Sequence, residues 1–563
     1  MTHLKTATSA AERPVKYCRL VWPALTAGLW IALFIVLALL PKSGHALPTL
    51  RDGAIAAFEI AVILVFFGWI AVSRISFQWV VVAGMSLASG LILAMLIASP
   101  ITGKSVHPDE FAHLGAYEYY VDHLLPPAVD DLATIPSTSV WGTSYLSELD
   151  VVYEIAARAT GQLRAFTSNN LLACRLFQFA IWGGLCLFAV VHRRWAVVLS
   201  VTLLSPQIWY IFSYFNADAF PLALALIAAG FVSDEYGGLG RFLRTGNLRS
   251  PAPWIAALCI GLILVSKANY LPVVLVFLLW LAVIHLGLRW YTVVLAVIGA
   301  LSVGTSVFVK GAPGISEWHM PLTLGGFTLA GGGLALFVWH CWRSGDKRPV
   351  FVRLVSFTLL CILIAAPRVA WDVHVNGWPS QKAERIQAVA EARAAPEFKP
   401  SIIAQGKGYP TIDLAARGVS LKDVFFAPYH WAATSLTSAF GVYGYMTIFG
   451  PNWLYWLMYA IAGLVVLVLL YSLKQNGPEH WLVMTTIVVG GAVLVLASSL
   501  LLSWTRELQA QGRYLFAILP MIALLFGHRP GRLPRRTLRL LIGAACICSV
   551  VSFAFVALPA LAG

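Results

Sequence analysis

Charged residues are scarce in this chain, and their scarcity excludes a soluble globular protein. Only 11% of the 563 residues are Asp, Glu, Lys or Arg, 59% are hydrophobic, and the mean hydropathy is +0.78. A water-soluble domain cannot bury that much apolar surface. Strands with the alternating pattern of a membrane barrel are also lacking. The composition therefore predicts an all-α, polytopic membrane protein, because a helix satisfies its own backbone hydrogen bonds in lipid.

Three further absences narrow the functional class. The eight cysteines lie almost entirely within or at the ends of apolar runs, which argues against a disulfide framework. The His-Glu-x-x-His pattern of zinc proteases is absent. No internal repeat is visible, whereas many transporters are built from repeats.

Long apolar runs, in contrast, are abundant, and they predict about fifteen transmembrane helices, since roughly 20 residues cross about 30 Å of hydrocarbon. The predicted spans lie near residues 20–40, 55–73, 78–99, 172–191, 195–212, 218–232, 253–266, 270–287, 291–308, 321–341, 351–370, 452–473, 481–503, 513–527 and 538–559. The first run is longer than the apolar core of a secretory leader, so we expect it to be retained.

Lysine and arginine predict the orientation, because basic residues of short loops stay in the cytoplasm. With the N-terminus inside, the cytoplasmic side receives Lys5, Arg13, Lys16, Arg19, Arg193, Arg194, Arg241, Arg244, Arg249, Arg343, Lys347, Arg348, Arg353, Arg529, Arg532, Arg535, Arg536 and Arg539. Much of the net charge of +14 is thus topological, and these loops are interpreted as membrane-surface anchors and not as nucleic-acid-binding patches.

This orientation predicts the domain organisation. A cytoplasmic tail at residues 1–19 precedes a transmembrane core at 20–290, which includes an external loop at 100–171. A C-terminal transmembrane region at 291–563 includes a second external loop at 371–450. We expect the protein in the inner (plasma) membrane, with its chemistry in the two outer loops.

The first external loop contains HPDEFAH at residues 107–113. Ionisable groups at a membrane boundary are costly and often functional. Proline at 108 suits the first turn of a helix, which would place Asp109, His113 and Tyr117 on one face with Glu110 beside His113. Carboxylates in a first turn are favoured in their ionised form by the helix dipole.

Three interpretations of this polar face remain open. His107, Glu110 and His113 would be metal ligands in the first. In the second, the two carboxylates only cap a juxtamembrane helix. In the third, Asp109 is a general base that takes a proton from an acceptor hydroxyl at the outer membrane surface. The rest of the chain favours the third.

The chain resembles the GT-C superfamily, multi-pass glycosyltransferases that use sugars on polyprenyl-phosphate or dolichyl-phosphate carriers. The resemblance is carried by the carboxylate pair in the first external loop and by NNLLACR at 169–175, SYFNAD at 213–218 and LVSKANYLP at 264–272. It is most similar to a bacterial group of multi-pass membrane proteins of unknown function, on the Pro-Asp-Glu-x-Ala-His segment at 108–113 and on QGRYL at 511–515, followed by Pro520.

The resemblance implies an all-α GT-C-like fold with extracytoplasmic juxtamembrane helices. It implies sugar transfer to a glycan or lipid acceptor at the extracytoplasmic face, with inversion at the anomeric carbon. The site residues that it implies are Asp109, Glu110, His113 and Asp218 as catalytic groups, Arg513, Lys267 and Arg175 on the donor phosphate, and His107, Tyr117 and Gln511 as substrate contacts. A divalent cation, Mg²⁺ or Mn²⁺, bridging Asp109, Glu110 and phosphate stays open.

Structural roles compete with these assignments. Arg513 at a helix end could snorkel towards water, and Asp218 could cap a helix beside Asn216. The alternative function is a transporter or flippase of lipid-linked sugars. The ionisable residues lie at predicted helix ends and not in the middle of spans, which favours transfer over transport. The groove for the isoprenoid tail cannot be placed from the sequence.

Overall fold

The computed structural model describes residues 76–101, 106–161, 167, 169–287, 290–309, 319–474, 478–528 and 534–561. The tail predicted at 1–19 and the spans predicted near 20–40 and 55–73 lie outside the described residues. Within the described ranges the chain is mostly helical, and its one sheet pairs β1 (Val442–Tyr443) antiparallel with β2 (Ile448–Phe449), Val442 opposite Phe449. The predicted all-α class is confirmed.

Eight helices of the described part are long and apolar enough to cross a membrane. They are α3 (Phe77–Ala98), α6 (Asn170–Val191), α12 (Leu271–Leu286, preceded by the 3-10 turn η5, Ala268–Tyr270), α14 (His319–Arg343), α15 (Arg348–Asn376), α20 (Asn452–Lys474), α21 (Pro478–Thr505) and α23 (Arg535–Ser552), which continues through the π-helical turn η10 (Phe553–Ala557) into α24 (Leu558–Leu561). Each coincides with a predicted span. The membrane class is supported, but the count of about fifteen spans is not confirmed.

Four of the remaining predicted spans form other helices. They are α9 (Ala219–Val232), α11 (Ala252–Leu264), α13 (Trp290–Val309) and α22 (Ile518–Gly527). At a rise of 1.5 Å per residue, α9, α11 and α22 extend for only about 21, 20 and 15 Å, which is less than the hydrocarbon thickness of about 30 Å. Their apolar composition reflects burial within the bundle, where α9 packs against both α11 and α22.

The span predicted near 195–212 is not a single helix. It divides into α7 (Arg193–Leu199), the 3-10 turn η4 (Ser200–Leu203) and α8 (Pro206–Ile211), whose start is set by Pro206 and by the Ser205 side chain accepting from the Gln207 N–H. The Trp209 indole donates to the Thr202 carbonyl at 2.9 Å, which satisfies a backbone group that a continuous helix would bond. Residues 196–212 are all buried. An apolar run predicts burial, but it does not distinguish a lipid-spanning helix from a broken core segment.

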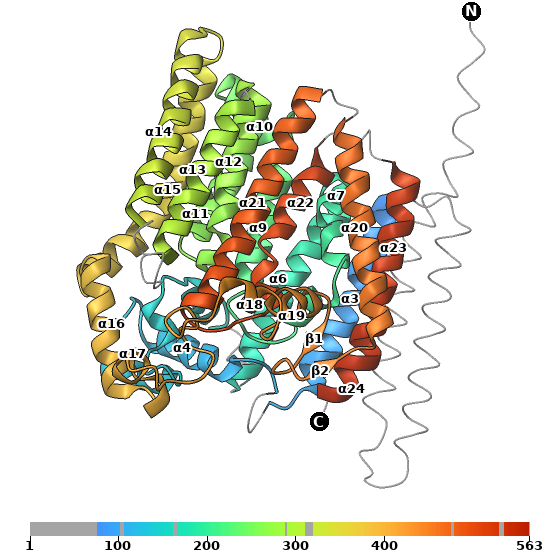
Figure 1. Cartoon of the computed structure of the whole chain (residues 1–563). Coiled ribbons are helices and arrows are strands. Elements are labelled where there is room, and N and C mark those ends of the chain that lie inside the picture. Colours follow the sequence, from blue (N-terminus) through green and yellow to red (C-terminus); the bar gives the residue numbers. More distant parts are fainter. Residues whose placement is uncertain are drawn as a thin grey trace, which may run out of the picture.

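The polar segments gather at one end of the bundle, below the long helices in Figure 1. The first contains α4 (Glu110–Asp122), η1 (Leu132–Ser137), η2 (Tyr145–Ser147) and α5 (Val152–Ala159), and the second contains α16 (Pro379–Arg393), η7 (Pro396–Phe398), α17 (Pro400–Ala404), α18 (Leu421–Phe425), α19 (Trp431–Ala439), β1 and β2. The turn η8 (Gly512–Leu515) contacts α19. We call this the polar end.

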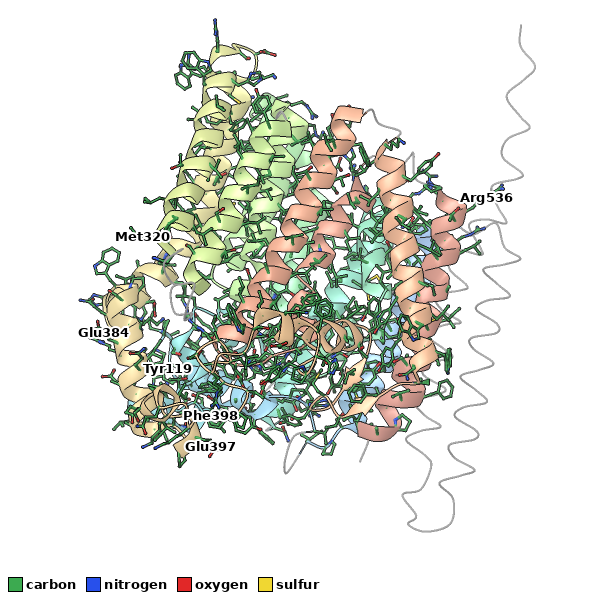
Figure 2. The ribbon with its side chains drawn as sticks, in the orientation of Figure 1. Tyr119, Met320, Glu384, Glu397, Phe398 and Arg536 are labelled. Atoms are coloured by element: carbon green, nitrogen blue, oxygen red, sulfur yellow. The ribbon has the colours of Figure 1, made fainter. Side chains whose placement is uncertain are left out.

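Basic segments meet at the opposite end, where Figure 1 places α10 (Gly238–Thr245) and Figure 2 labels Arg536. Contacts join these segments although they are far apart in the sequence. The Arg353 guanidinium donates to the Leu243 carbonyl at 3.1 Å, and that of Arg194 donates to the Gly527 carbonyl at 2.9 Å. The predicted separation of basic loops from long polar loops is therefore present in the fold, and we call this second end the basic end.

Candidate functional site

Asp109 stands immediately before α4, outside the helix. Its φ of 59° lies in the left-handed region, which aspartate and asparagine tolerate better than most residues. The helix therefore starts at Glu110, two residues after Pro108. The prediction that Asp109, His113 and Tyr117 form one polar helix face is wrong, because the left-handed residue turns Asp109 out of the helical repeat.

Glu110 faces into the protein, where it forms a fully buried ion pair with Arg175 of α6. Both carboxylate oxygens take part, at 2.8 Å to Nε and 2.7 Å to Nη2. The other guanidinium hydrogens of Arg175 bond the carbonyls of Leu96, Ser99 and Pro100, where α3 ends. All five N–H donors of Arg175 are thus engaged by the protein. This arrangement does not fit the predicted role of Arg175 as a phosphate ligand.

The loop before α9 presents Asp218 to the site. Asn216, and not Asp218, caps this helix. The Oδ1 atom of Asn216 accepts from the N–H groups of Asp218 at 2.8 Å and Ala219 at 3.1 Å. The carboxylate of Asp218, which is fully buried, is therefore available to Lys267, whose Nζ lies 2.8 Å from Oδ1. The capping role considered for Asp218 falls to its neighbour. Glu110 fixes the same loop, because its Oε1 accepts from the Phe215 N–H at 3.1 Å.

Arg513 connects the two aspartates. Its Nη2 donates to Asp109 Oδ2 at 3.0 Å, and its Nε lies 3.8 Å from Asp218 Oδ2. The guanidinium also lies over the ring of Tyr514, 5.4 Å from the ring centroid, and the Lys267 ammonium lies 5.3 Å from that centroid. Asp109, Arg513, Asp218 and Lys267 thus form a continuous chain of alternating charges, which we call the charge chain.

A glycine allows Arg513 to reach this position. A Cβ at Gly512 would lie 2.0 Å from the backbone N of Ala439, so only glycine permits η8 to approach α19 this closely. The Gly512 N–H donates to the Ser438 hydroxyl at 2.6 Å, which holds the approach. Arg513 is only 6% exposed, and its Nε and Nη1 are buried without a hydrogen-bond partner in the part of the chain that the structure describes. Buried donors are usually bonded, so these two N–H groups are positioned to donate to an ordered water or to a ligand.

A small cavity of about 110 Å³ opens beside the charge chain. Its lining comprises Pro108, Asp109, Gln207, Tyr210, Tyr214, Ser438, Val442, Gly444, Tyr445, Met446, Gln511, Gly512 and Arg513. Gln511 therefore lies at the site as predicted, together with Asp109 and Arg513. Pockets for whole ligands usually measure about 300–1,000 Å³, so this cavity is large enough for only part of such a ligand.

Seven of the ten predicted site residues do not line this cavity. Four of them form the ion pairs described above, namely Glu110, Arg175, Asp218 and Lys267. The other three are His107, His113 and Tyr117, which are buried. His107 is fully buried, with Nδ1 2.9 Å from the Tyr210 hydroxyl, and Tyr117 is buried with its hydroxyl 2.8 Å from that of Thr160. His113 stacks on Tyr145 and places Nδ1 2.8 Å from the Tyr153 hydroxyl. Burial lowers the pKa of His107 to about 4 and that of His113 well below its usual value, so both imidazoles are neutral at pH 7. Their contacts orient α4 and its preceding loop.

The metal interpretation finds no preassembled ligand set. Within the described ranges no group of three or more His, Cys, Asp and Glu side chains is placed to hold a metal ion. Glu110 directs both oxygens to Arg175, so it does not form the cation bridge with Asp109 that the sequence left open.

Several cavity residues were not predicted. Tyr214 belongs to the SYFNAD stretch, but only Asp218 was selected from it, because an acid carries a clearer chemical signal than a tyrosine. Gln207, Ser438 and Tyr445 come from segments without a recognisable pattern. Nothing in their local sequence indicates that the fold brings them to Asp109.

A second, apolar cavity of about 570 Å³ lies between α12, α13, α14 and α15. Its lining includes Leu275, Leu278, Ala296, Phe327 and Leu359. Leu275 lies four residues beyond the start of α12 at Leu271, about 6 Å of helix rise, and Lys267 caps the turn η5 that precedes this helix, so the cavity extends along a helix that begins near the charge chain. The sequence could not place such a groove.

Comparison with models of known protein families finds no match, and no curated protein matches the chain. The functional assignment therefore depends on the residues and geometry of the charge chain.

Proposed function

We propose that the protein transfers a sugar from a polyprenyl-phosphate donor to a hydroxyl of a glycan or lipid acceptor, and that the reaction takes place at the polar end, on the extracytoplasmic side of the membrane. The observation that carries this proposal is the charge chain beside a cavity, in which a partly exposed carboxylate and a buried, incompletely bonded arginine are in direct contact.

In this reaction Asp109 is the general base. It accepts the proton of the acceptor hydroxyl while that oxygen forms a bond to the anomeric carbon, and the bond from this carbon to the phosphate oxygen breaks with its electron pair leaving on the phosphate. The Asp109 side chain is 40% exposed, so an acceptor can reach it, whereas Asp218 is fully buried. Direct displacement inverts the anomeric centre.

Arg513 and Lys267 bind the donor phosphate. A guanidinium offers a planar fork that matches two phosphate oxygens. In Arg513 such a fork is formed by Nη1, which has no hydrogen-bond partner among the residues that the structure describes, and by Nη2, which donates to Asp109. Asp218 keeps both cations in place and balances part of their charge. When phosphate engages Arg513, the contact between Arg513 and Asp109 weakens, which releases the base for the acceptor. Donor binding would thus prepare the catalytic carboxylate.

The isoprenoid tail of the donor would occupy the apolar cavity between α12 and α15. Burying apolar chain stabilises a complex by about 0.8 kcal/mol per CH₂ group, so a groove of this kind holds a long lipid without polar contacts. Because only the three-residue turn η5 separates Lys267 from α12, a phosphate on Lys267 and a tail along α12 are compatible in direction.

Donor binding and turnover by the full-length protein in liposomes test this proposal. Arg513→Gln should weaken binding of a polyprenyl-phosphate sugar roughly 10- to 150-fold, the loss expected for charge-assisted hydrogen bonds of about 1.5–3 kcal/mol. Arg513→Lys should recover only part, since it restores charge without the fork. Arg506→Gln is the matched control, because Arg506 is an exposed arginine at the end of α21 and does not line the cavity.

The same liposomes distinguish transfer from the flippase alternative. Transfer releases free polyprenyl phosphate and forms a glycosylated acceptor, whereas a flippase relocates an intact donor between leaflets. Intact donor in the opposite leaflet, with no free polyprenyl phosphate in the presence of cell-envelope acceptors, would assign the charge chain to transport.

A further inference from the structure

Another pocket lies at the basic end, away from the charge chain. It has a volume of about 260 Å³ and lies where α3, α7 and α23 begin. Its lining comprises Phe77, His192, Arg193, Arg194, Val197, Arg535 and Leu538. Three arginines from two elements far apart in the sequence therefore converge on one pocket, and no acidic residue is among the lining residues.

The three arginines differ in how they are held. Arg194 is fixed by an ion pair with Asp234 and by hydrogen bonds to the Ser233 and Gly527 carbonyls at 2.8 and 2.9 Å. Arg193 and Arg535 are exposed, and neither forms an ion pair with any residue that the structure describes. The pocket thus combines one guanidinium held by Asp234 with two guanidinium groups whose charge is not balanced by a carboxylate. Such a group of arginines favours binding of an anion with several oxygens.

The pocket also has an apolar side at a defined depth. Phe77, Val197 and Leu538 are 6%, 7% and 1% exposed, so they form a packed floor. Phe77 is the first residue of the spanning helix α3, and Leu538 lies in the first turn of the spanning helix α23. The pocket is therefore at the level where spanning helices leave the hydrocarbon, which is the level of lipid headgroups.

We propose that this pocket binds the phosphodiester headgroup of an anionic phospholipid in the leaflet at the basic end. The arginines would contact the phosphate oxygens, and the apolar floor would contact the glycerol and the first methylenes of the acyl chains. Basic pockets between transmembrane helices recognise anionic headgroups by this combination of charge and apolar contact. A soluble phosphate compound would satisfy the arginines but not the floor. This proposal is independent of the sugar-transfer reaction.

Lipid titration of the delipidated full-length protein, followed by native mass spectrometry, tests the proposal. Phosphatidylglycerol should bind more tightly than phosphatidylethanolamine, whose headgroup carries no net charge. The double variant Arg193→Gln/Arg535→Gln should bind phosphatidylglycerol roughly 30-fold more weakly, since one basic residue near an anionic surface accounts for about a fivefold factor.

The matched control is Arg343→Gln/Arg536→Gln, which removes the same charge from two exposed positions at the basic end that do not line the pocket. It should leave the affinity for phosphatidylglycerol unchanged. An equal loss in both double variants would reduce the effect to general surface attraction and overturn the proposal. Displacement of the lipid by inorganic phosphate at comparable concentration would overturn it too, because it would identify a simple anion site.

Discussion

Replacement of Asp109 by asparagine separates catalysis from folding with unusual clarity in this structure. The residue sits at φ 59°, and asparagine adopts this conformation as readily as aspartate does. Asp109 forms an ion pair with Arg513, and the Asp109 side chain is 40% exposed to solvent. Loss of this ion pair should therefore change the free energy of unfolding by at most about 1 kcal/mol. Asp109→Asn should therefore insert and fold normally. Alanine would be a poorer choice, because a left-handed alanine adds about 1–2 kcal/mol of strain.

The expected effect on turnover is much larger than the effect on stability. Removal of a positioned general base lowers a rate about 10²- to 10⁴-fold, which corresponds to about 3–5 kcal/mol in activation free energy. Donor affinity should not fall, because the amide holds Arg513 less strongly than the carboxylate does and leaves the guanidinium to the phosphate. The variant should thus lower kcat without raising the KM for the donor.

The assay is release of polyprenyl phosphate by purified protein in liposomes, with cell-envelope acceptors and a panel of polyprenyl-phosphate monosaccharides. Thermal unfolding of the same preparations checks the fold. Asp109→Gly is a second variant for the same test, since glycine also accepts the backbone conformation and lacks the carboxylate. It should lose turnover as Asp109→Asn does. Turnover within threefold of the wild type in a fully folded Asp109→Asn protein would refute Asp109 as the base.

Four further predictions follow from other parts of the structure. Arg175→Met should destabilise the protein by roughly 3–5 kcal/mol in thermal unfolding, because it removes one partner of a buried ion pair and leaves the Glu110 carboxylate uncompensated; a raised donor KM with unchanged stability would instead make Arg175 a phosphate ligand. Ala296→Trp, which fills the apolar cavity, should raise the KM for long polyprenyl donors and not for two-isoprene analogues, and equal effects on both would place the tail elsewhere. Burial, followed by the negative charge of Glu148, raises the pKa of Asp150 from 3.8 to about 8, so the folded protein holds a proton that the unfolded chain loses, and stability should fall as pH rises between about 4 and 8; Asp150→Asn should flatten this dependence, and an identical slope in the variant would contradict it. Reporter fusions near residues 130 and 245 should report outside and cytoplasm respectively, and the reverse result would remove the proposed orientation.

The sequence predicts helix positions well where an apolar run is long and uninterrupted, as in α3, α6, α15 and α20. The prediction of membrane spans fails where an equally apolar segment is buried inside the protein. Residues 195–212 are as apolar as a span, yet Pro206 and nearby hydroxyls divide them into two short helices, α7 and α8, with the 3-10 turn η4 between them. Hydropathy measures the preference for leaving water and carries no information on whether lipid or protein receives the side chain.

The candidate site shows a similar division. Asp109 was selected because it is an ionisable group at the end of an apolar run, whereas Asp218, Lys267 and Arg513 were selected from the motifs that carry the family resemblance. The pairing of these groups was not predictable, since it depends on contacts between residues separated by up to 404 positions. Glu110 illustrates the limit: it is adjacent to Asp109 in the sequence, but it faces the opposite direction and serves Arg175.

The span of 404 residues between Asp109 and Arg513 has a consequence for biosynthesis. During co-translational insertion, the carboxylate enters the membrane region early, whereas its arginine partner emerges from the ribosome only after most other helices have been threaded. A ribosome that stalls before η8 would leave an inserted fragment that holds Asp109, Asp218 and Lys267 but no guanidinium between them. Under the proposed function, such a fragment would lack the arginine that binds the donor phosphate, so sugar transfer would require the complete chain.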